Sequence, residues 1–312
     1  MSGITVLAAG PCDTIQDRGR QGLLAQGFSP SGSMDQRSAF IGNRLVGNAA
    51  SCAVLEYAYM GPTLRFDQDA TICLTGAPFS ATRSGEALEP YCTHRVHAGD
   101  VVCCGRAQAG VYGYLAVAGG IAVPPVLGSR STSVRYGIGG LEGRRLRPGD
   151  QLPLTAAPHR RASLPSHDAY FAWHSAAQPC WIRVVVANAT EQPRWPSLFD
   201  GPFTVDAASD RMGLRLRGTH ALPPATADLT SEALALGTIQ VPASGDPIVA
   251  MADRQTTGGY CKAGVVAGVD LPRLAQCRPG TTVRFEPINV EAAQRMLCRD
   301  ARYLQNLDVL SS

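Results

Sequence analysis

The sequence predicts a mainly β protein of two lobes with a few short helices. The chain has 312 residues, which exceeds the roughly 250–300 that usually share one hydrophobic core, so two domains are expected. Hydrophobic residues make up 45% of the chain, enough for two cores, whereas charged residues make up only 17%. The 33 glycines and 22 prolines indicate many turns, as is typical of short strands joined by tight connections.

The first lobe, residues 1–155, contains short apolar runs that are rich in Val, Ile, Thr and Tyr and bounded by Gly or Asp. This pattern is typical of strands. One segment differs, because Asp35 is placed to cap a helix that runs to about Val46 and stops at Gly47. The strands predicted in this lobe are residues 4–7, 53–60, 71–75, 101–104 and 111–118.

Residues 156–179 lack the strand pattern and are rich in Ala, Pro, His, Arg and Ser. We expect this segment to be a linker. The second lobe, residues 180–312, resumes the pattern of strands. Residues 243–246 have the composition of a hairpin turn between two of these strands. The strands predicted in this lobe are residues 181–186, 203–205, 238–241, 247–252, 262–269 and 282–285.

A final helix is predicted after Asn289, which can cap its first turn. Val290, Ala293 and Leu297 recur at helical spacing along this segment. We therefore expect these three residues to form the buried stripe of the helix.

Charge and composition exclude several classes of protein. The net charge is only +3, without a run of five or six like charges, so we expect no nucleic-acid partner and no membrane surface. No apolar run approaches 18 residues, and the chain does not start with a signal-like segment. The ten cysteines form no Cys-x-x-Cys pair, and His94 and His97 alone define no ligand set. These patterns predict a cytoplasmic protein with reduced cysteines and no metal site.

The densest group of functional candidates is residues 253–262, a polar loop between two predicted strands. Consecutive glycines let the backbone approach a ligand, hydroxyls and an amide supply donors, and Lys262, the only lysine of the chain, supplies a compact charge. An ordinary glycine loop with a capping aspartate would have the same composition. The candidates are Asp253, Gln255, Thr256, Thr257, Gly258, Gly259, Tyr260 and Lys262.

Three further arginines lie in short polar segments. Arg130 is flanked by serines and followed by Thr132, and Arg18 and Arg211 lie beside glycine and aspartate. A guanidinium in such a setting can hold a carboxylate or phosphate, although each segment could equally be a turn with an internal salt bridge. Since these groups occur in both halves of the chain, they favour an anion site between the lobes. We include Arg18, Arg130, Ser131, Thr132 and Arg211 in this predicted site.

Common nucleotide and hydrolase motifs are missing from the sequence. There is no G-x-x-x-x-G-K-[ST] loop for phosphates, no G-x-S-x-G nucleophile turn and no H-E-x-x-H zinc helix. The chain alone is therefore not expected to be a P-loop nucleotide-binding protein, a serine hydrolase of that type or a zinc protease.

Six segments, in the same order along the chain, resemble the biotin-dependent carboxyltransferase-like family. This family includes the C-type subunit of bacterial 5-oxoprolinase, the antagonist of the Kip kinase inhibitor and the second half of the urea carboxylase carboxyltransferase region. Cys261 departs from the family pattern, which commonly has proline after Gly-Gly-Tyr. The segments are residues 14–20 (TIQDRGR), 32–35 (GSMD), 127–132 (LGSRST), 209–213 (SDRMG), 237–242 (GTIQVP) and 253–260 (DRQTTGGY).

The resemblance implies a cyclophilin-like β-barrel in each lobe and a role in an enzyme of several subunits. The leading expectation is a subunit of an ATP-dependent 5-oxoprolinase, which opens 5-oxo-L-proline to L-glutamate. Its partners would be a smaller related subunit (the B-type subunit, similar to the Kip inhibitor) and a third subunit of lactam-hydrolase type, and the assembled complex would use ATP. Gln240 lies in one of the matching segments and is added to the predicted binding residues. The expected catalytic residues are Asp253, Gln255 and Lys262, with Asp253 as base or orienting group.

Two alternatives remain open at this point. The chain could be a carboxyltransferase subunit of a biotin-dependent urea or amide carboxylase. Lys262 lacks the methionine neighbours of a biotin-carrying lysine, so a partner would have to supply biotin. It could also be a non-enzymatic antagonist that binds a kinase inhibitor.

Overall fold

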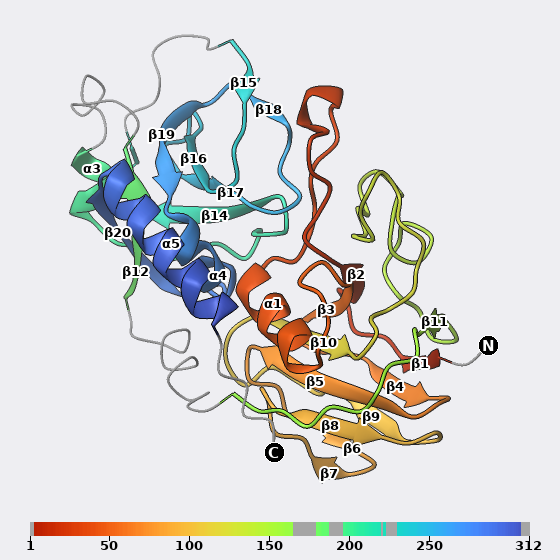
Figure 1. Cartoon of the computed structure of the whole chain (residues 1–312). Coiled ribbons are helices and arrows are strands. Elements are labelled where there is room, and N and C mark those ends of the chain that lie inside the picture. The colour runs from red at the N-terminus through yellow and green to blue at the C-terminus, as the bar shows by residue number, and fades with distance from the viewer. Residues whose placement is uncertain (1–2, 165–178, 187–195, 220, 223–229, 307–312) are drawn as a thin grey trace. The chain divides into compact units, whose positions relative to one another are not determined.

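The structure is a computed structural model that describes residues 3–164, 179–186, 196–219, 221–222 and 230–306. Within these ranges the chain divides into two compact units (Figure 1). The first contains residues 3–21 and 31–164, and the second contains residues 22–30 and those from 179 to 306. Both units are built mainly from strands, which confirms the predicted fold class.

The first unit consists of a six-stranded sheet, ordered β11-β1-β4-β9-β6-β7, and a five-stranded sheet, ordered β2-β3-β10-β5-β8. All of the pairings within these sheets are antiparallel, and all five strands predicted in this half are confirmed. The strands are β1 (Gly3–Ala8), β2 (Thr14–Gln16), β3 (Val54–Ala58), β4 (Thr63–Phe66), β5 (Ala70–Gly76), β6 (Thr82–Arg83), β7 (Glu86–Ala87), β8 (Thr93–Val96), β9 (Val101–Cys103), β10 (Tyr112–Val117) and β11 (Gln151–Pro153).

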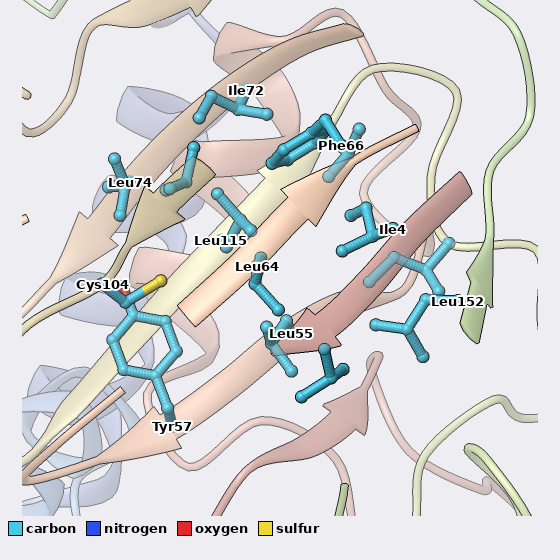
Figure 2. Close-up of a cluster of buried hydrophobic side chains, with 14 of the residues drawn as sticks. Ile4, Leu55, Tyr57, Leu64, Phe66, Ile72, Leu74, Cys104, Leu115 and Leu152 are labelled. Carbon is cyan, nitrogen blue, oxygen red and sulfur yellow. The ribbon is translucent and has the colours of Figure 1, made fainter. Parts of the chain in front are cut away.

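The core of the first unit lies between these two sheets (Figure 2). Ile4 and Leu64 of the six-stranded sheet pack with Leu55 and Leu115 of the other, and all four side chains are fully buried. Burial of large aliphatic side chains typically contributes about 1.5–3 kcal/mol each, so this contact is a major source of the unit's stability.

Helix α1 (Gln36–Leu45) covers the other face of the five-stranded sheet, against β5 and β10. Asp35 caps it as predicted, because its carboxylate accepts hydrogen bonds from the backbone N–H of Ser38 (2.9 Å) and from the Ser38 hydroxyl (2.6 Å). The helix ends before Gly47, which takes the left-handed conformation (φ 81°) that lets the chain turn away.

Part of the predicted linker packs against the first unit. The Thr93 N–H donates to the Ala162 carbonyl (2.8 Å), and the Leu164 N–H donates to the Tyr91 carbonyl (3.0 Å). Ala162 and Leu164 are buried. Residues 162–164 therefore run antiparallel to residues 91–93, at the start of β8. Residues 165–178 of the predicted linker lie outside the described residues.

The second unit is a closed barrel, ordered β12-β19-β16-β17-β14-β13-β20, with a separate two-stranded sheet, β15-β18. The parallel pairing of β12 with β20 closes the barrel, and β16 and β17 form the predicted hairpin. All six strands predicted in this half are confirmed. The strands are β12 (Cys180–Val185), β13 (Phe203–Val205), β14 (Gly213–Gly218), β15 (Glu232–Ala233), β16 (Thr238–Val241), β17 (Ile248–Ala250), β18 (Thr257–Gly258), β19 (Cys261–Val266) and β20 (Thr282–Ile288).

Short helices and one buried ion pair complete the second unit. Asp270 has no exposed surface and accepts hydrogen bonds from the backbone N–H and the guanidinium of Arg183, which ties the turn after β19 to β12. The helices are η1 (Leu24–Gln26), α3 (Pro196–Asp200), η3 (Gly268–Asp270), α4 (Leu271–Ala275) and α5 (Val290–Gln305). No helix in the described ranges is long and apolar enough to cross a membrane.

Helix α5 begins after Asn289, whose side chain accepts the Ala292 N–H (2.8 Å) as predicted for a cap. The prediction of a buried stripe is wrong, because none of its residues is buried and Val290 and Leu297 are 49% and 52% exposed. The helix packs mainly against the short turn η3 rather than against a sheet. Helical periodicity in the sequence correctly indicated a helix but did not reveal what lies beside it.

Asp13, between β1 and β2, is a carboxyl group buried in the first unit without an ionic partner among the described residues. The Gly10 N–H donates to Oδ2 (2.5 Å), while Oδ1 has no hydrogen-bond partner in the described part of the chain. Burial raises the pKa of the Asp13 carboxyl from 3.8 to about 7.

This pKa makes the stability of the protein dependent on pH. In the folded state Asp13 holds its proton up to pH about 7, whereas in the unfolded chain it loses it near pH 4. Asp13 by itself therefore favours the folded state most below pH 4, and this contribution is lost as the pH rises to about 7. Asp13→Asn keeps an acceptor for Gly10 but cannot ionise. It should stabilise the protein at pH 8 by on the order of 2–4 kcal/mol and have little effect near pH 4.

Thermal unfolding of the parent and of Asp13→Asn between pH 4 and pH 8 tests this expectation. Asp67→Asn is a suitable control, because Asp67 is hydrogen-bonded to Thr5 and Arg65, which lower the pKa of its carboxyl. Parallel pH profiles for the parent and Asp13→Asn would show that the buried carboxyl does not control the pH dependence.

Candidate functional site

Most of the predicted residues of the second unit gather where the small sheet β15-β18 covers strands β16 and β19. Gln240 of β16 lies directly opposite Lys262 of β19, so their side chains emerge on the same face of the barrel wall. On this face a Cβ atom at Gly258 would overlap the amide nitrogen of Gln240. Any larger residue at this position would displace the Gln240 amide, so Gly258 lets this amide stay beneath β18.

Gln240 has an amide group that lacks an internal partner. The residue is only 8% exposed, and its Nε2 makes no hydrogen bond to any residue that the structure describes. A buried donor without an acceptor costs about 1–3 kcal/mol, so native proteins seldom keep one. This amide is well suited to bind an oxygen atom of a ligand.

Lys262 is held against β15 by two hydrogen bonds. Its Nζ donates to Oε2 of Glu232 (2.7 Å) and to the Ala233 carbonyl (3.0 Å). The hydrogen bond and the charge of Lys262 lower the pKa of the Glu232 carboxyl. An ammonium has three donors, so one remains for a ligand. The compact cation noticed in the sequence is thus placed on the same face as Gln240.

Asp253 and Arg211, both predicted site residues, bind one another. The Arg211 Nε donates to Oδ2 of Asp253 (2.7 Å) and Nη2 to Oδ1 (3.3 Å), a two-point ion pair. The Asp253 N–H also donates to the Arg211 carbonyl (2.8 Å). The pair joins the loop before β14 to the loop after β17, so Asp253 is placed to orient this loop rather than to stand alone in a cavity.

Arg254 is a residue that sequence reasoning missed. It is only 7% exposed, and its Nε donates to the Leu234 carbonyl (2.9 Å). It has no carboxylate partner within the described residues, and burial lowers the pKa of its guanidinium because burial disfavours the charged form. The neighbouring carbonyl, that of Ala233, binds Lys262, so consecutive residues of one short segment hold both cations.

The remaining predicted residues of the loop surround this cluster. Thr257 and Gly258 form β18, and the Thr256 carbonyl accepts the Leu234 N–H (2.9 Å). Their roles are therefore partly structural. The exposed members of the loop are Gln255, Thr257, Gly259 and Tyr260.

The predicted residues of the first unit are organised by the carboxylate of Asp17. Its Oδ1 accepts the hydroxyls of Ser129 (2.6 Å) and Ser131 (2.5 Å), and its Oδ2 accepts the Arg130 N–H (2.5 Å). The Thr132 hydroxyl donates to the Ile15 carbonyl (3.0 Å). Ser131 and Thr132 were predicted to bind an anion, but their hydroxyls already bind acceptors of the protein.

Two arginines of the first unit remain as candidates. Arg18 is exposed on the turn that follows β2. Arg130 is half-buried, and its Nε donates to the Val123 carbonyl (2.8 Å). Whether these residues share a site with those of the second unit stays a prediction. Across the described residues, no group of three or more His, Cys, Asp and Glu side chains is arranged to hold a metal ion.

The sequence profile described as "carboxyltransferase domain, subdomain A and B" matches residues 26–287. This chain belongs to that carboxyltransferase family. The predicted resemblance is confirmed, and the matched residues include Gln240, Arg254 and Lys262.

Full-length relatives support the same assignment to the carboxyltransferase family. The chain is 38% identical to the C-type subunit of 5-oxoprolinase from Haemophilus influenzae over 300 residues, which cover 94% of each chain. It is 36% identical to the C-type subunit of 5-oxoprolinase from Escherichia coli over 314 residues, which cover 97% of each. Each alignment therefore covers nearly all of both chains.

Urea carboxylase contains the same fold within a much longer chain. The crystal structure of the Kluyveromyces lactis enzyme matches with a TM-score of 0.88 and 27% identity over 98% of this chain, but over only 29% of that protein. This member of the carboxyltransferase family thus corresponds to less than a third of the urea carboxylase.

The unpartnered amide of Gln240 leads to a prediction about stability. Gln240→Met keeps a long side chain and removes the unsatisfied donor, so it should raise the free energy of unfolding by about 1–2 kcal/mol. Gln16 is a useful comparison, because this buried glutamine uses its Nε2 to bind Thr14 (3.0 Å) and the Thr132 carbonyl (3.1 Å), although its Oε1 has no hydrogen-bond partner among the described residues. Gln16→Met should instead destabilise the protein. Denaturant unfolding measures both, and a loss of stability in Gln240→Met would indicate that its amide is satisfied in the folded protein.

Proposed function

We propose that this chain is the C-type subunit of a cytoplasmic, ATP-dependent 5-oxoprolinase that opens 5-oxo-L-proline to L-glutamate. The observation that carries the proposal is its 38% identity to the corresponding 5-oxoprolinase subunit of Haemophilus influenzae over 94% of both chains. The enzyme would act on a cyclic amide, and this chain would be active only with its partner subunits. Those are a smaller related subunit and a third subunit of lactam-hydrolase type.

The donor cluster of the second unit suits this chemistry. A lactam carbonyl is unreactive, and its oxygen must carry negative charge or a phosphate before the ring opens. The Gln240 amide could donate to that oxygen, while Arg254 and the third donor of Lys262 stabilise the charge of a phosphate or carboxylate. Asp253, through Arg211, would keep the loop that carries Arg254 in place.

Two motifs that the sequence lacks support the assignment of ATP binding and biotin attachment to other parts of the complex. It contains no phosphate-binding loop of the P-loop type, so ATP would be bound by the assembled complex. Lys262 is its sole lysine, and its neighbours are not those of a biotin-carrying site. Any biotin would therefore come from a partner.

A second candidate function is transfer of a carboxyl group to urea or another amide. It is favoured by the likeness to Kluyveromyces lactis urea carboxylase, at a TM-score of 0.88 over 98% of this chain. The two functions share the need for donors around an amide oxygen. They differ in their dependence on biotin, which gives an experimental distinction.

Reconstitution with the two partner subunits tests the proposal directly. The purified chain alone should release no glutamate from 5-oxoproline and ATP, whereas the assembled complex should release glutamate and ADP. Avidin, which sequesters biotin, should leave this activity unchanged. An assembled complex that is inactive on 5-oxoproline but carboxylates urea, with inhibition by avidin, would favour the second candidate instead.

Lys262 provides a sharper test within the same complex. Lys262→Ala should lower kcat/KM roughly ten- to hundredfold, because a charge-assisted hydrogen bond to the ligand would be lost. Glu232→Ala removes the same ion pair from the other side and should leave kcat/KM close to that of the parent. Thermal unfolding of both variants shows whether the fold is kept. Equal losses of activity in the two variants would identify Lys262 as a tether of β15 only.

A further inference from the structure

A second candidate site is a cleft whose lining residues all belong to the first unit. Its volume is about 200 Å³. The floor is the turn after β10, residues 119–120, and one wall is the segment 121–125. Cys52, Arg130 and Thr155 line the remainder, and Arg130 is the one lining residue with a permanent charge.

Arg130 faces this cleft with an unneutralised guanidinium. Its only side-chain hydrogen bond within the described residues is from Nε to the Val123 carbonyl (2.8 Å). The nearby carboxylate of Asp17 is occupied by the Ser129 and Ser131 hydroxyls and by the backbone of Arg130. The two terminal nitrogens of the guanidinium are therefore left to bind a planar anion at two points.

The cleft is built from backbone that is held in place. Gly119 has φ 82°, and a Cβ atom there would overlap the Thr155 carbonyl. The Gly119 N–H donates to the side chain of Asn48 (2.8 Å). Ile121 forms a bridge with Leu154, which fixes the wall beside the turn. A site that is organised before the ligand arrives loses less entropy on binding.

We propose that this cleft binds a small carboxylic acid, with its carboxylate on Arg130 and its apolar body against residues 121–125. One guanidinium matches one carboxylate, whereas a nucleotide triphosphate would need several cations. The volume is below the roughly 300–1,000 Å³ of pockets for drug-sized ligands, so the ligand should be about the size of a single five-membered ring. The choice of 5-oxoproline as a probe rests on the function proposed above, but the carboxylate site does not.

Binding to the full-length chain, measured by calorimetry or ligand-observed NMR, tests the site with four probes. 5-Oxoproline and cyclopentanecarboxylate should bind saturably. 2-Pyrrolidone, which lacks the carboxylate, and inorganic phosphate should bind at least tenfold more weakly. If only cyclopentanecarboxylate binds, the site stands and 5-oxoproline is not its ligand. Absence of binding by both acids, or tighter binding of phosphate, would overturn the proposal.

Variants locate the binding. Arg130→Gln should weaken both acids at least tenfold, and Arg130→Lys, which keeps a charge but not the two-point geometry, should have intermediate affinity. Arg106→Gln is the matched control, because Arg106 is exposed and its side chain has no partner within the described residues. Thermal unfolding checks that each variant is folded. Equal affinities for the parent and Arg130→Gln would refute the site.

Cys52 offers a readout that does not depend on catalysis. Its thiol is free and lines the cleft, whereas the free thiol of Cys298 is exposed on α5. Bound acid should slow alkylation of Cys52 by iodoacetamide in the parent, as measured by peptide mass spectrometry. It should not slow alkylation of Cys298, nor of Cys52 in Arg130→Gln. Unaltered Cys52 alkylation at saturating acid would place the ligand elsewhere, even if the complex turns over 5-oxoproline.

Discussion

The carboxylate of Asp17 joins two segments that are more than 110 residues apart in the sequence, by accepting the Ser129 and Ser131 hydroxyls and the Arg130 N–H. The same arrangement recurs in the second unit, where Asp270 binds the backbone and side chain of Arg183. Because these carboxylates accept hydrogen bonds from other segments of the same unit, they hold the loops between strands in place. They also leave some arginines of this arginine-rich chain without an acidic partner among the residues that the structure describes.

That internal use of carboxylates is the basis of the two ligand sites proposed above. Arg254 and Arg130 are positioned by carbonyl groups, which orient a guanidinium but do not neutralise it. An arginine held in this way keeps its charge available, whereas Arg211, which faces Asp253, does not. The structural arginine Arg211 and the arginines proposed to bind ligands thus differ in the charge of the group that holds them.

Much of the fold could be predicted from local patterns. Strands and the helix capped by Asp35 are set by neighbours in the sequence, so their positions were predicted within a few residues. The partners of polar side chains were not predictable in the same way. Lys262 meets Glu232 and Asp253 meets Arg211, 30 and 42 residues away, and only the folded chain shows that Arg254 lacks such a partner within its described part. The exposure of α5 could not be predicted either, because periodicity does not reveal what a helix packs against.

The sole lysine has a practical consequence for chemical labelling. Only one side chain of this protein carries a primary amine, and its Nζ is hydrogen-bonded to Glu232 and to the Ala233 carbonyl. Reagents that acylate amines therefore have a single side-chain target, and it lies opposite Gln240. A fluorophore attached to Lys262 would report on movements of the small sheet β15-β18. No engineered cysteine would be needed, and no other lysine would compete for the reagent.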